Sequence, residues 1–169
     1  MIARQARRAD IPAIAALIGH FAAAGKLLPR TQSEIHGQVS RFLVLTEKRR
    51  LLACLSLENY GADLAEIRSL AVDPSVQGGG LGRRLVEFAL QEARERGIAR
   101  VFAVTHAPGF FIGQGFSLIR RSSLEEKVER DCRSCPKARR CSLSAVIATV
   151  LPERAVLRVI ESAGAPLEA

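Results

Sequence analysis

A glycine-rich segment in the middle of the chain has the composition of an anion-binding turn. It stands between an apolar run that ends at Val72 and an amphipathic run that begins at Gly82, and it contains Gly78, Gly79 and Gly80. A turn of this kind before a helix leaves backbone N–H groups free at the positive end of the helix dipole, where a phosphate group can bind. Glycine is required where the backbone must approach the phosphate without an intervening Cβ. The segment therefore predicts a phosphate-binding loop, with a flexible connection as the alternative.

Two common nucleotide-binding motifs do not fit this segment. No Gly-Lys-Ser/Thr sequence follows the glycines, which excludes a P-loop. The preceding strand lies late in the chain and no acidic residue follows at the required distance, which excludes the dinucleotide-binding motif.

Three cysteines form a second pattern that could do chemistry. Cys132, Cys135 and Cys141 could supply three thiolate ligands to a structural zinc ion, with Asp131 or a histidine as the fourth. The alternative is three reduced thiols in a loop near the substrate. Because the sequence shows no clear fourth ligand, no metal is assigned. Cys54 stands alone in an apolar run and is expected to be a small buried hydrophobe.

The elements that position these residues follow from hydrophobic periodicity and turn signals. Strands are predicted over residues 2–7, 42–46, 51–57, 64–72, 98–105 and 143–151, and another is predicted to begin at residue 115. Helices are predicted over residues 10–24, 31–38, 82–96 and 108–114. A cysteine-rich loop is expected before the last strand. Short connections favour antiparallel pairing of the first strands, and the crossover through residues 82–96 favours parallel pairing.

Length and composition limit the partners and the location of the protein. The 169 residues fit one domain, with a core over residues 2–150 and a C-terminal extension over residues 151–169. The formal charge is +8, but there is no Trp, only one Tyr, and the arginines are scattered, so no nucleic-acid partner is expected. No apolar run reaches the roughly 18 residues of a membrane span. The first ten residues contain no apolar signal core, so a cytoplasmic protein is expected.

The glycine-rich segment also resembles a known family. Gln77-x-x-Gly80-x-Gly82 is similar to the signature of the GNAT superfamily of N-acetyltransferases, and residues 70–74 are similar to the strand that leads to it. The resemblance implies an α/β fold with a mixed, splayed β-sheet and helices on both faces. It implies acetyl-CoA as co-substrate, with its pyrophosphate on the amides of residues 78–83 and its pantetheine beside the strand. The implied binding set is Leu70, Ala71, Val72, Gln77, Gly78, Gly79, Gly80, Leu81, Gly82 and Arg83.

A narrower resemblance indicates the acceptor. Residues 27–31, 52–54, 64–67, 101–105 and 110–116 are similar to the acetyltransferase domain of N-acetylglutamate synthases in its short, stand-alone form. This implies acetylation of the α-amine of L-glutamate, a step of arginine biosynthesis. The amino-acid-kinase domain of longer synthases is not in this sequence, so arginine feedback through that domain is not expected. Two alternatives stay open: a GNAT enzyme for another small amine or a protein amine, and a non-catalytic protein that senses CoA or binds nucleic acid. A homodimer is possible.

Three charged residues are expected on the acceptor side. The resemblance places Arg30 against a substrate carboxylate, with a surface arginine as the alternative, and either Arg68 or one of Arg139 and Arg140 is the candidate for a second carboxylate. Glu66 is the candidate catalytic residue, because a carboxylate can accept a proton from the amine directly or through water. The alternative for Glu66 is a salt bridge, for example with Arg68. Phe111 stands where many GNAT enzymes have a Tyr that protonates the leaving thiolate, so that role is missing here.

Overall fold

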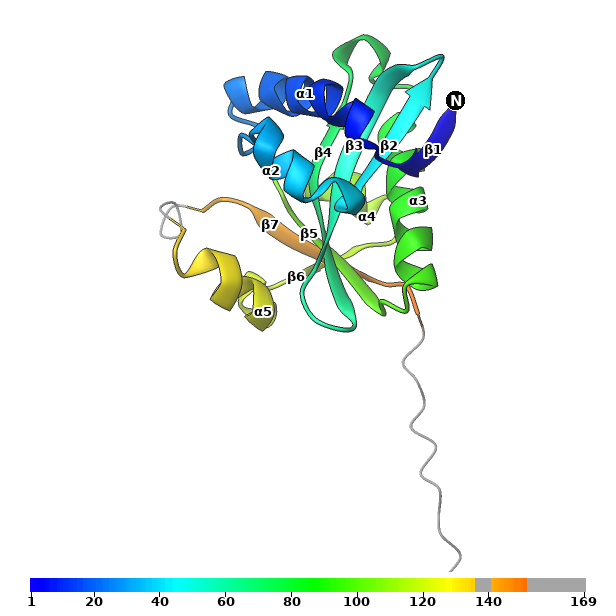
Figure 1. Cartoon of the computed structure of the whole chain (residues 1–169). Helices are drawn as coiled ribbons and strands as arrows, with labels where there is room; N and C mark the ends of the chain where they lie inside the picture. The colour runs from blue at the N-terminus through cyan, green and yellow to red at the C-terminus, as the bar shows by residue number, and fades with distance from the viewer. Residues whose placement is uncertain (136–140, 152–169) are drawn as a thin grey trace, which may run out of the picture.

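A mixed β-sheet forms the centre of the protein in the computed structural model, which describes residues 1–135 and 141–151 (Figure 1). The seven strands have the order β1-β2-β3-β4-β5-β7-β6. Their bounds are Ile2–Gln5 for β1, Phe42–Glu47 for β2, Arg50–Asn59 for β3, Leu64–Val72 for β4, Arg100–Thr105 for β5, Ser117–Ile119 for β6 and Ser144–Thr149 for β7. Strands β1 to β4 form an antiparallel meander, β4 and β5 are parallel, and β7 is antiparallel to both β5 and β6. The predicted mixed sheet and the parallel crossover are confirmed.

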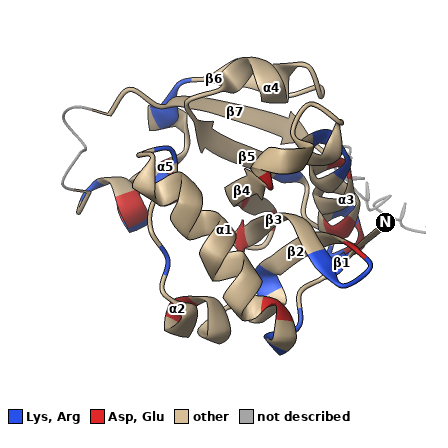
Figure 2. Cartoon of the chain, turned by 90° about the horizontal axis from the view of Figure 1, so that it is seen from above, with Lys and Arg blue, Asp and Glu red and all other residues tan. Residues whose placement is uncertain are grey.

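Helices cover both faces of this sheet, as predicted (Figure 2). The helices are α1 (Ile11–Ala23), α2 (Gln32–Gly37), α3 (Leu81–Glu95), α4 (Pro108–Ile112) and the single turn α5 (Glu125–Lys127). Successive strand residues point to opposite faces, so β2 divides its side chains between two cores. Leu43 and Leu45 pack in the core that contains residues of α3, whereas Phe42 and Val44 pack in the core that contains residues of α1.

The residues that the sequence analysis expected to begin and end helices do so through contacts within the same segment. Thr31 and Glu34 form a reciprocal capping box at the start of α2, in which the Thr31 hydroxyl accepts from the Glu34 amide at 3.2 Å and Glu34 accepts from the Thr31 amide at 2.6 Å. Helix α3 buries Leu85 and Ala89 completely and ends at Gly97, whose φ is +74°.

The sheet splays between β4 and β5. These strands pair only at Leu64, Ala65 and Glu66, although both continue beyond that point. Further along β4, Ser69 has a φ of +52°, and the register with β3 shifts between Cys54 and Ser56. This bulge turns the strand locally. The backbone of β4 after Glu66 therefore faces no neighbouring strand on its β5 side within the described residues.

The region between β6 and β7 differs from the prediction. It was expected to be a loop, but it contains the turns η4 (Arg121–Ser123) and α5, followed by the π-helical turn η5 (Val128–Cys132). The prediction was wrong because these turns are too short to show a helical period. They are held instead by Leu124, which packs with Tyr60 and Phe102, and by charged contacts described below.

Two further differences concern the sheet and the tail. Strand β3 continues past the predicted end at residue 57 to Asn59, and β7 inserts between β5 and β6, an order the sequence did not predict. The short element considered after residue 152 lies outside the described residues, and so do Arg139 and Arg140, the other candidates for the second carboxylate. Within the described residues, no helix has both the length and the apolar character that crossing a membrane requires.

Candidate active site

The glycine-rich loop joins the end of β4 to the start of α3. Gly78 and Gly80 have φ values of +83° and +73°, a conformation that favours glycine. Within the described part of the chain, no backbone carbonyl accepts a hydrogen bond from the amides of residues 78–83. These amides stand at the N-terminal end of a 15-residue helix. The loop therefore offers a row of donors at the positive end of a helix dipole, which suits a pyrophosphate group.

The spacing around the loop also suits a ligand that approaches the backbone. An added Cβ at Gly80 would meet no atom within 4 Å, so the space over this residue is open. An added Cβ at Gly82 would come within 3.3 Å of the Phe110 ring, so glycine lets α3 begin close to α4. The same Cβ at Gly82 would lie 3.5 Å from the side chain of Val72, at the end of β4.

The face of the sheet under α1 changes from apolar to charged along β3 and β4. Cys54 is completely buried in the core next to α1. Further along, Ser56 pairs with Arg68 and Glu58 pairs with Glu66 across the two strands. The carboxylates of Glu58 and Glu66 are almost completely buried, with 2% and 3% of their side chains exposed. A buried carboxylate requires cationic or hydrogen-bonding partners, and helical turns of distant segments provide them.

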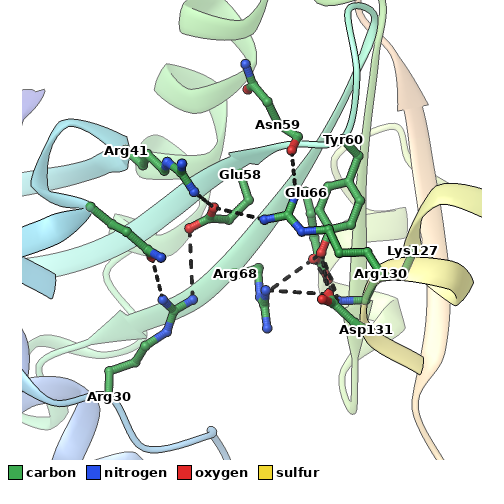
Figure 3. A network of polar contacts seen from close by, with 11 residues as sticks. Arg30, Arg41, Glu58, Asn59, Tyr60, Glu66, Arg68, Lys127, Arg130 and Asp131 are labelled. Carbon is green, nitrogen blue, oxygen red and sulfur yellow. Dashed lines mark hydrogen bonds and ion pairs between the residues drawn. The ribbon is translucent and has the colours of Figure 1, made fainter. Parts of the chain in front are cut away.

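Lys127 provides the cation for Glu66. Its Nζ lies 2.9 Å from Glu66 Oε2 and 2.6 Å from Asp131 Oδ2, and the side chain is nearly buried (Figure 3). The Tyr60 hydroxyl donates to Glu66 Oε2 at 2.8 Å and also contacts Asp131. Arg68 lies 3.6 Å from both carboxylates. These contacts connect the α5–η5 turns to the middle of the sheet.

Three arginines surround Glu58. Arg41 Nη1 donates to Glu58 Oε2 at 2.6 Å, and Arg130 Nη2 lies 4.0 Å from the same oxygen. Arg30 Nη1 donates to the side chain of Gln38 at 2.8 Å, and its Nη2 lies 4.0 Å from Glu58 Oε1. Only 13% of the Arg30 side chain is exposed, so this arginine is more enclosed than a surface arginine usually is.

The electrostatics of the site show where cations are crowded. Burial, followed by repulsion from Arg68, lowers the pKa of Arg30. Burial alone would lower the pKa of Arg68, but the nearby anions, Glu66 first, raise it. Burial would raise the pKa of Asp131, but its hydrogen bonds with Lys127 and Tyr60 lower it. Burial and the charge of Glu66 raise the pKa of Tyr60, so its hydroxyl stays protonated and donates.

The charges on this face do not balance. The cations are Arg30, Arg41, Arg68, Lys127 and Arg130, and the anions are Glu58, Glu66 and Asp131. Five cations against three carboxylates leave an excess of two positive charges among these residues, and the exposed carboxylate of Glu34 also acts on Arg30 from outside the set. The face can therefore accept a ligand with two anionic groups.

Comparisons with known proteins agree with this arrangement. The model of the acetyltransferase (GNAT) family matches residues 14–116. The chain is 36% identical over 147 residues to an uncharacterized N-acetyltransferase of Chlorobaculum tepidum, and the match covers 87% of this chain and 95% of that protein. The chain belongs to the GNAT acetyltransferase family. It is an N-acetyltransferase, as the resemblance of the glycine-rich segment implied.

Two relatives of this GNAT enzyme have described activities. An amino-acid acetyltransferase of Neisseria meningitidis is 38% identical over 133 residues, which is 78% of this chain and 30% of that protein. A crystal structure of N-acetylglutamate synthase from Neisseria gonorrhoeae, complexed with coenzyme A and N-acetyl-glutamate, matches with a TM-score of 0.82 and 33% identity. That match covers 89% of this chain and 35% of the synthase chain, so this chain spans about a third of the longer relatives. The bound coenzyme A agrees with acetyl-CoA as co-substrate.

In the structure of this acetyltransferase, the three residues that the sequence analysis expected on the acceptor side lie close together. Arg30, Glu66 and Arg68 lie on one face, and Glu66 does contact Arg68, as the salt-bridge alternative expected. Sequence reasoning missed the residues that hold them, which are Arg41, Glu58, Tyr60, Lys127, Arg130 and Asp131. One signal was available, because Ser56 and Glu58 alternate with Leu55 and Leu57 at the end of an apolar strand. The helical turns that carry Lys127 gave no such signal.

The remaining sequence predictions concern aromatic and sulfur side chains. Phe111 is buried and packs edge-to-face against Phe116, so it offers no proton donor. Cys54 is buried, and its burial raises the thiol pKa to about 12. Cys132 and Cys141 are half-buried and Cys135 is exposed. Among the described residues, which omit 136–140, no three potential metal ligands gather in one place.

Proposed function

We propose that this GNAT enzyme transfers the acetyl group of acetyl-CoA to the α-amine of L-glutamate and thereby serves arginine biosynthesis. The observation that carries the proposal is the excess of two positive charges on the acceptor face. We use this name for the face of the sheet that carries five cations and three carboxylates, which are Arg30, Arg41, Arg68, Lys127, Arg130, Glu58, Glu66 and Asp131. Glutamate brings two carboxylates and one amine. A face with this charge favours a dicarboxylate over neutral or cationic amines.

Arg30 and Arg68 support this choice most directly. Their guanidinium groups repel each other strongly enough to contribute to the lowered pKa of Arg30. A carboxylate bound between them would relieve the repulsion and could accept paired N–H donors. The Nη2 atom of Arg30 supports the same role, because the carboxylate oxygen that it approaches among the described residues, Glu58 Oε1, lies at 4.0 Å, which is beyond hydrogen-bond distance.

The related proteins support the substrate class. The Neisseria meningitidis relative is an amino-acid acetyltransferase, and the Neisseria gonorrhoeae synthase was crystallised with coenzyme A and N-acetyl-glutamate. We extend that chemistry to this chain as part of the proposal.

The glycine-rich loop and the β4 edge would hold acetyl-CoA, which supplies the acetyl thioester. The amides of Gly78, Gly79, Gly80, Leu81, Gly82 and Arg83 would donate to the pyrophosphate, next to Gln77. The splayed backbone at Leu70, Ala71 and Val72 would pair with the pantetheine arm. An amide of β4 aimed at the thioester carbonyl would stabilise the developing oxyanion.

Glu66 would act as the general base that accepts a proton from the acceptor amine. The amine nitrogen forms a bond to the acetyl carbon, the carbon–sulfur bond breaks, and coenzyme A leaves as a thiol. The amine proton passes to Glu66, directly or through water. Since Phe111 offers no acid, water protonates the leaving sulfur.

A thiol-release assay over a panel of amines tests the function. The panel contains glutamate, glutamine, aspartate, a polyamine, an aminoglycoside and a peptide with a free N-terminus. We expect glutamate to have the highest kcat/KM. Preference for an uncharged or cationic amine would remove glutamate as the acceptor. No turnover of any amine, with coenzyme A still bound, would support a CoA-sensing protein instead.

A further inference from the structure

The charge excess on the acceptor face is unevenly distributed. We divide the face into the Lys127 half (Glu66, Arg68, Lys127 and Asp131) and the Glu58 half (Arg30, Arg41, Glu58 and Arg130). The Lys127 half has two cations and two carboxylates and is balanced. The Glu58 half has three cations around one buried carboxylate and carries the excess, although the exposed carboxylate of Glu34 also acts on Arg30. The anionic end of an acceptor is therefore favoured in the Glu58 half.

The three arginines around Glu58 come from three different segments of the chain. Arg30 follows α1, Arg41 ends the turn η2 (Val39–Arg41), and Arg130 lies in η5 (Figure 3). Arg41 and Arg130 approach the same oxygen, Oε2, at 2.6 and 4.0 Å. The other oxygen, Oε1, is buried and has no hydrogen-bond partner among the described residues. A buried carboxylate so placed fixes the arginines with respect to one another.

Arg41 and Arg130 keep donors available after binding Glu58. Each side chain is 45% exposed. The guanidinium carbon of Arg130 lies over the Tyr60 ring, 4.4 Å from the ring centre, and Nη1 donates to the Asn59 carbonyl at 2.8 Å. A guanidinium held in this way is already oriented, so little side-chain freedom is lost when it binds a carboxylate.

We propose that Arg41 and Arg130 determine the specificity for a dicarboxylate acceptor, by binding its side-chain carboxylate in the Glu58 half. The acceptor amine then lies toward Glu66 in the balanced Lys127 half. This inference rests on the proposed function for the reaction, and it adds two residues and an orientation of the substrate.

Glutamate and glutamine form the matched pair of acceptors for the test. Both have the same α-amine, α-carboxylate and chain length, and they differ only in the side-chain charge. We expect Arg41→Gln and Arg130→Gln each to lower the ratio of kcat/KM for glutamate over glutamine by roughly 5- to 10-fold, the effect of losing one half-exposed charged hydrogen bond. The double variant should lower the ratio further. Arg41→Lys and Arg130→Lys keep the charge and should retain most of the ratio.

Arg133→Gln is the control for the same segment. Arg133 is 73% exposed and pairs only with Glu129 at 3.7 Å among the described residues, so its loss should leave the ratio unchanged. An unchanged ratio in the double variant, or equal losses for both acceptors, would overturn the inference.

A binding experiment separates this inference from the proposed function. Calorimetry with glutarate, a dicarboxylate without an amine, should show weaker binding to the double variant than to the wild type. If the wild-type enzyme acetylates neither acceptor, the proposed function fails, and glutarate binding still decides the inference. Equal glutarate affinity in both proteins would overturn it.

Discussion

The two sides of the active site are built in different ways. The glycine-rich loop presents backbone amides from consecutive residues, 78–83, of which residues 78–80 and 83 are exposed. The acceptor face presents charged side chains from β3, β4, η2, η5 and the segment after α1, several of them buried. A backbone site tolerates exchange of side chains as long as its glycines remain. A side-chain site depends on each partner, because removal of one leaves another charge buried without compensation.

Replacement of Gly80 by valine tests the backbone side and has the largest expected effect. Valine at a φ of +73° is strained, and its side chain would fill the open space over the loop. Gly80→Val should remove measurable acetyl-CoA binding by calorimetry.

Gly97→Val is the matched control for Gly80. Gly97 ends the same helix with a φ of +74° and open space over its Cβ, so the backbone strain is comparable. This variant should lose stability but keep its acetyl-CoA affinity. Unchanged affinity in a folded Gly80→Val protein would contradict the role of the loop.

Replacement of Arg30 by alanine tests one side chain of the acceptor face. Loss of one partner of a buried, hydrogen-bonded ion pair costs roughly 2–5 kcal/mol. Arg30→Ala should therefore raise the KM for glutamate by about 30-fold or more and leave the KM for acetyl-CoA nearly unchanged, as measured by steady-state kinetics. Arg30→Lys should restore activity only in part, because lysine cannot make a planar two-point contact. An Arg30→Ala enzyme with normal glutamate kinetics would place the substrate elsewhere.

Replacement of Lys127 by methionine tests the buried network itself. Without the ammonium group, Glu66 keeps Arg68 at 3.6 Å as its remaining cationic partner among the described residues. We expect Lys127→Met to lower the free energy of unfolding by about 3 kcal/mol in a urea titration. Lys26→Met, at an exposed site, should change it by less than about 0.5 kcal/mol.

A double variant shows whether the stability that Lys127→Met loses depends on the contact of Lys127 with Glu66. In the Lys127→Met background, Glu66→Gln should destabilise less than it does alone, because the two residues are coupled. Additive effects of the two substitutions would mean that Lys127 stabilises the fold independently of Glu66.

Acid titration of Asp73 gives the smallest effect and concerns the turn before the glycine-rich loop. Hydrogen bonds from Ser75 and Arg50 lower the pKa of Asp73 to about 2, from an ordinary value of 3.8. A lowered pKa in the folded state stabilises the protein above the ordinary value, and this stabilisation disappears as the pH falls toward about 2. The difference in urea midpoint between wild type and Asp73→Asn should therefore shrink from pH 5 to pH 3. A constant difference across this range would contradict the charged role of Asp73.

The elements with strong local signals were predictable. The capping box at Thr31, the period of α3 and the apolar β4 were assigned with nearly the observed bounds. The α5–η5 turns were missed because each is three to five residues long, which is too short to display a period. Cys54 was correctly expected in the core because it stands within an apolar run.

The sequence by itself determined the family and the splayed sheet and predicted the glycine-rich loop as a phosphate site, because these depend on neighbouring residues and on the backbone geometry that glycine permits. It also indicated Arg30 through a resemblance of short segments, Glu66 through the chemistry of a carboxylate on the strand, and Arg68 as one of three candidate arginines. The tertiary structure alone decided that Glu58 gathers arginines from three segments and that Lys127 reaches Glu66, 61 positions earlier in the chain. Burial makes such partnerships necessary, since an uncompensated charge is costly inside a protein. Local sequence cannot name the partner, because the pairing depends on how the strands and turns pack.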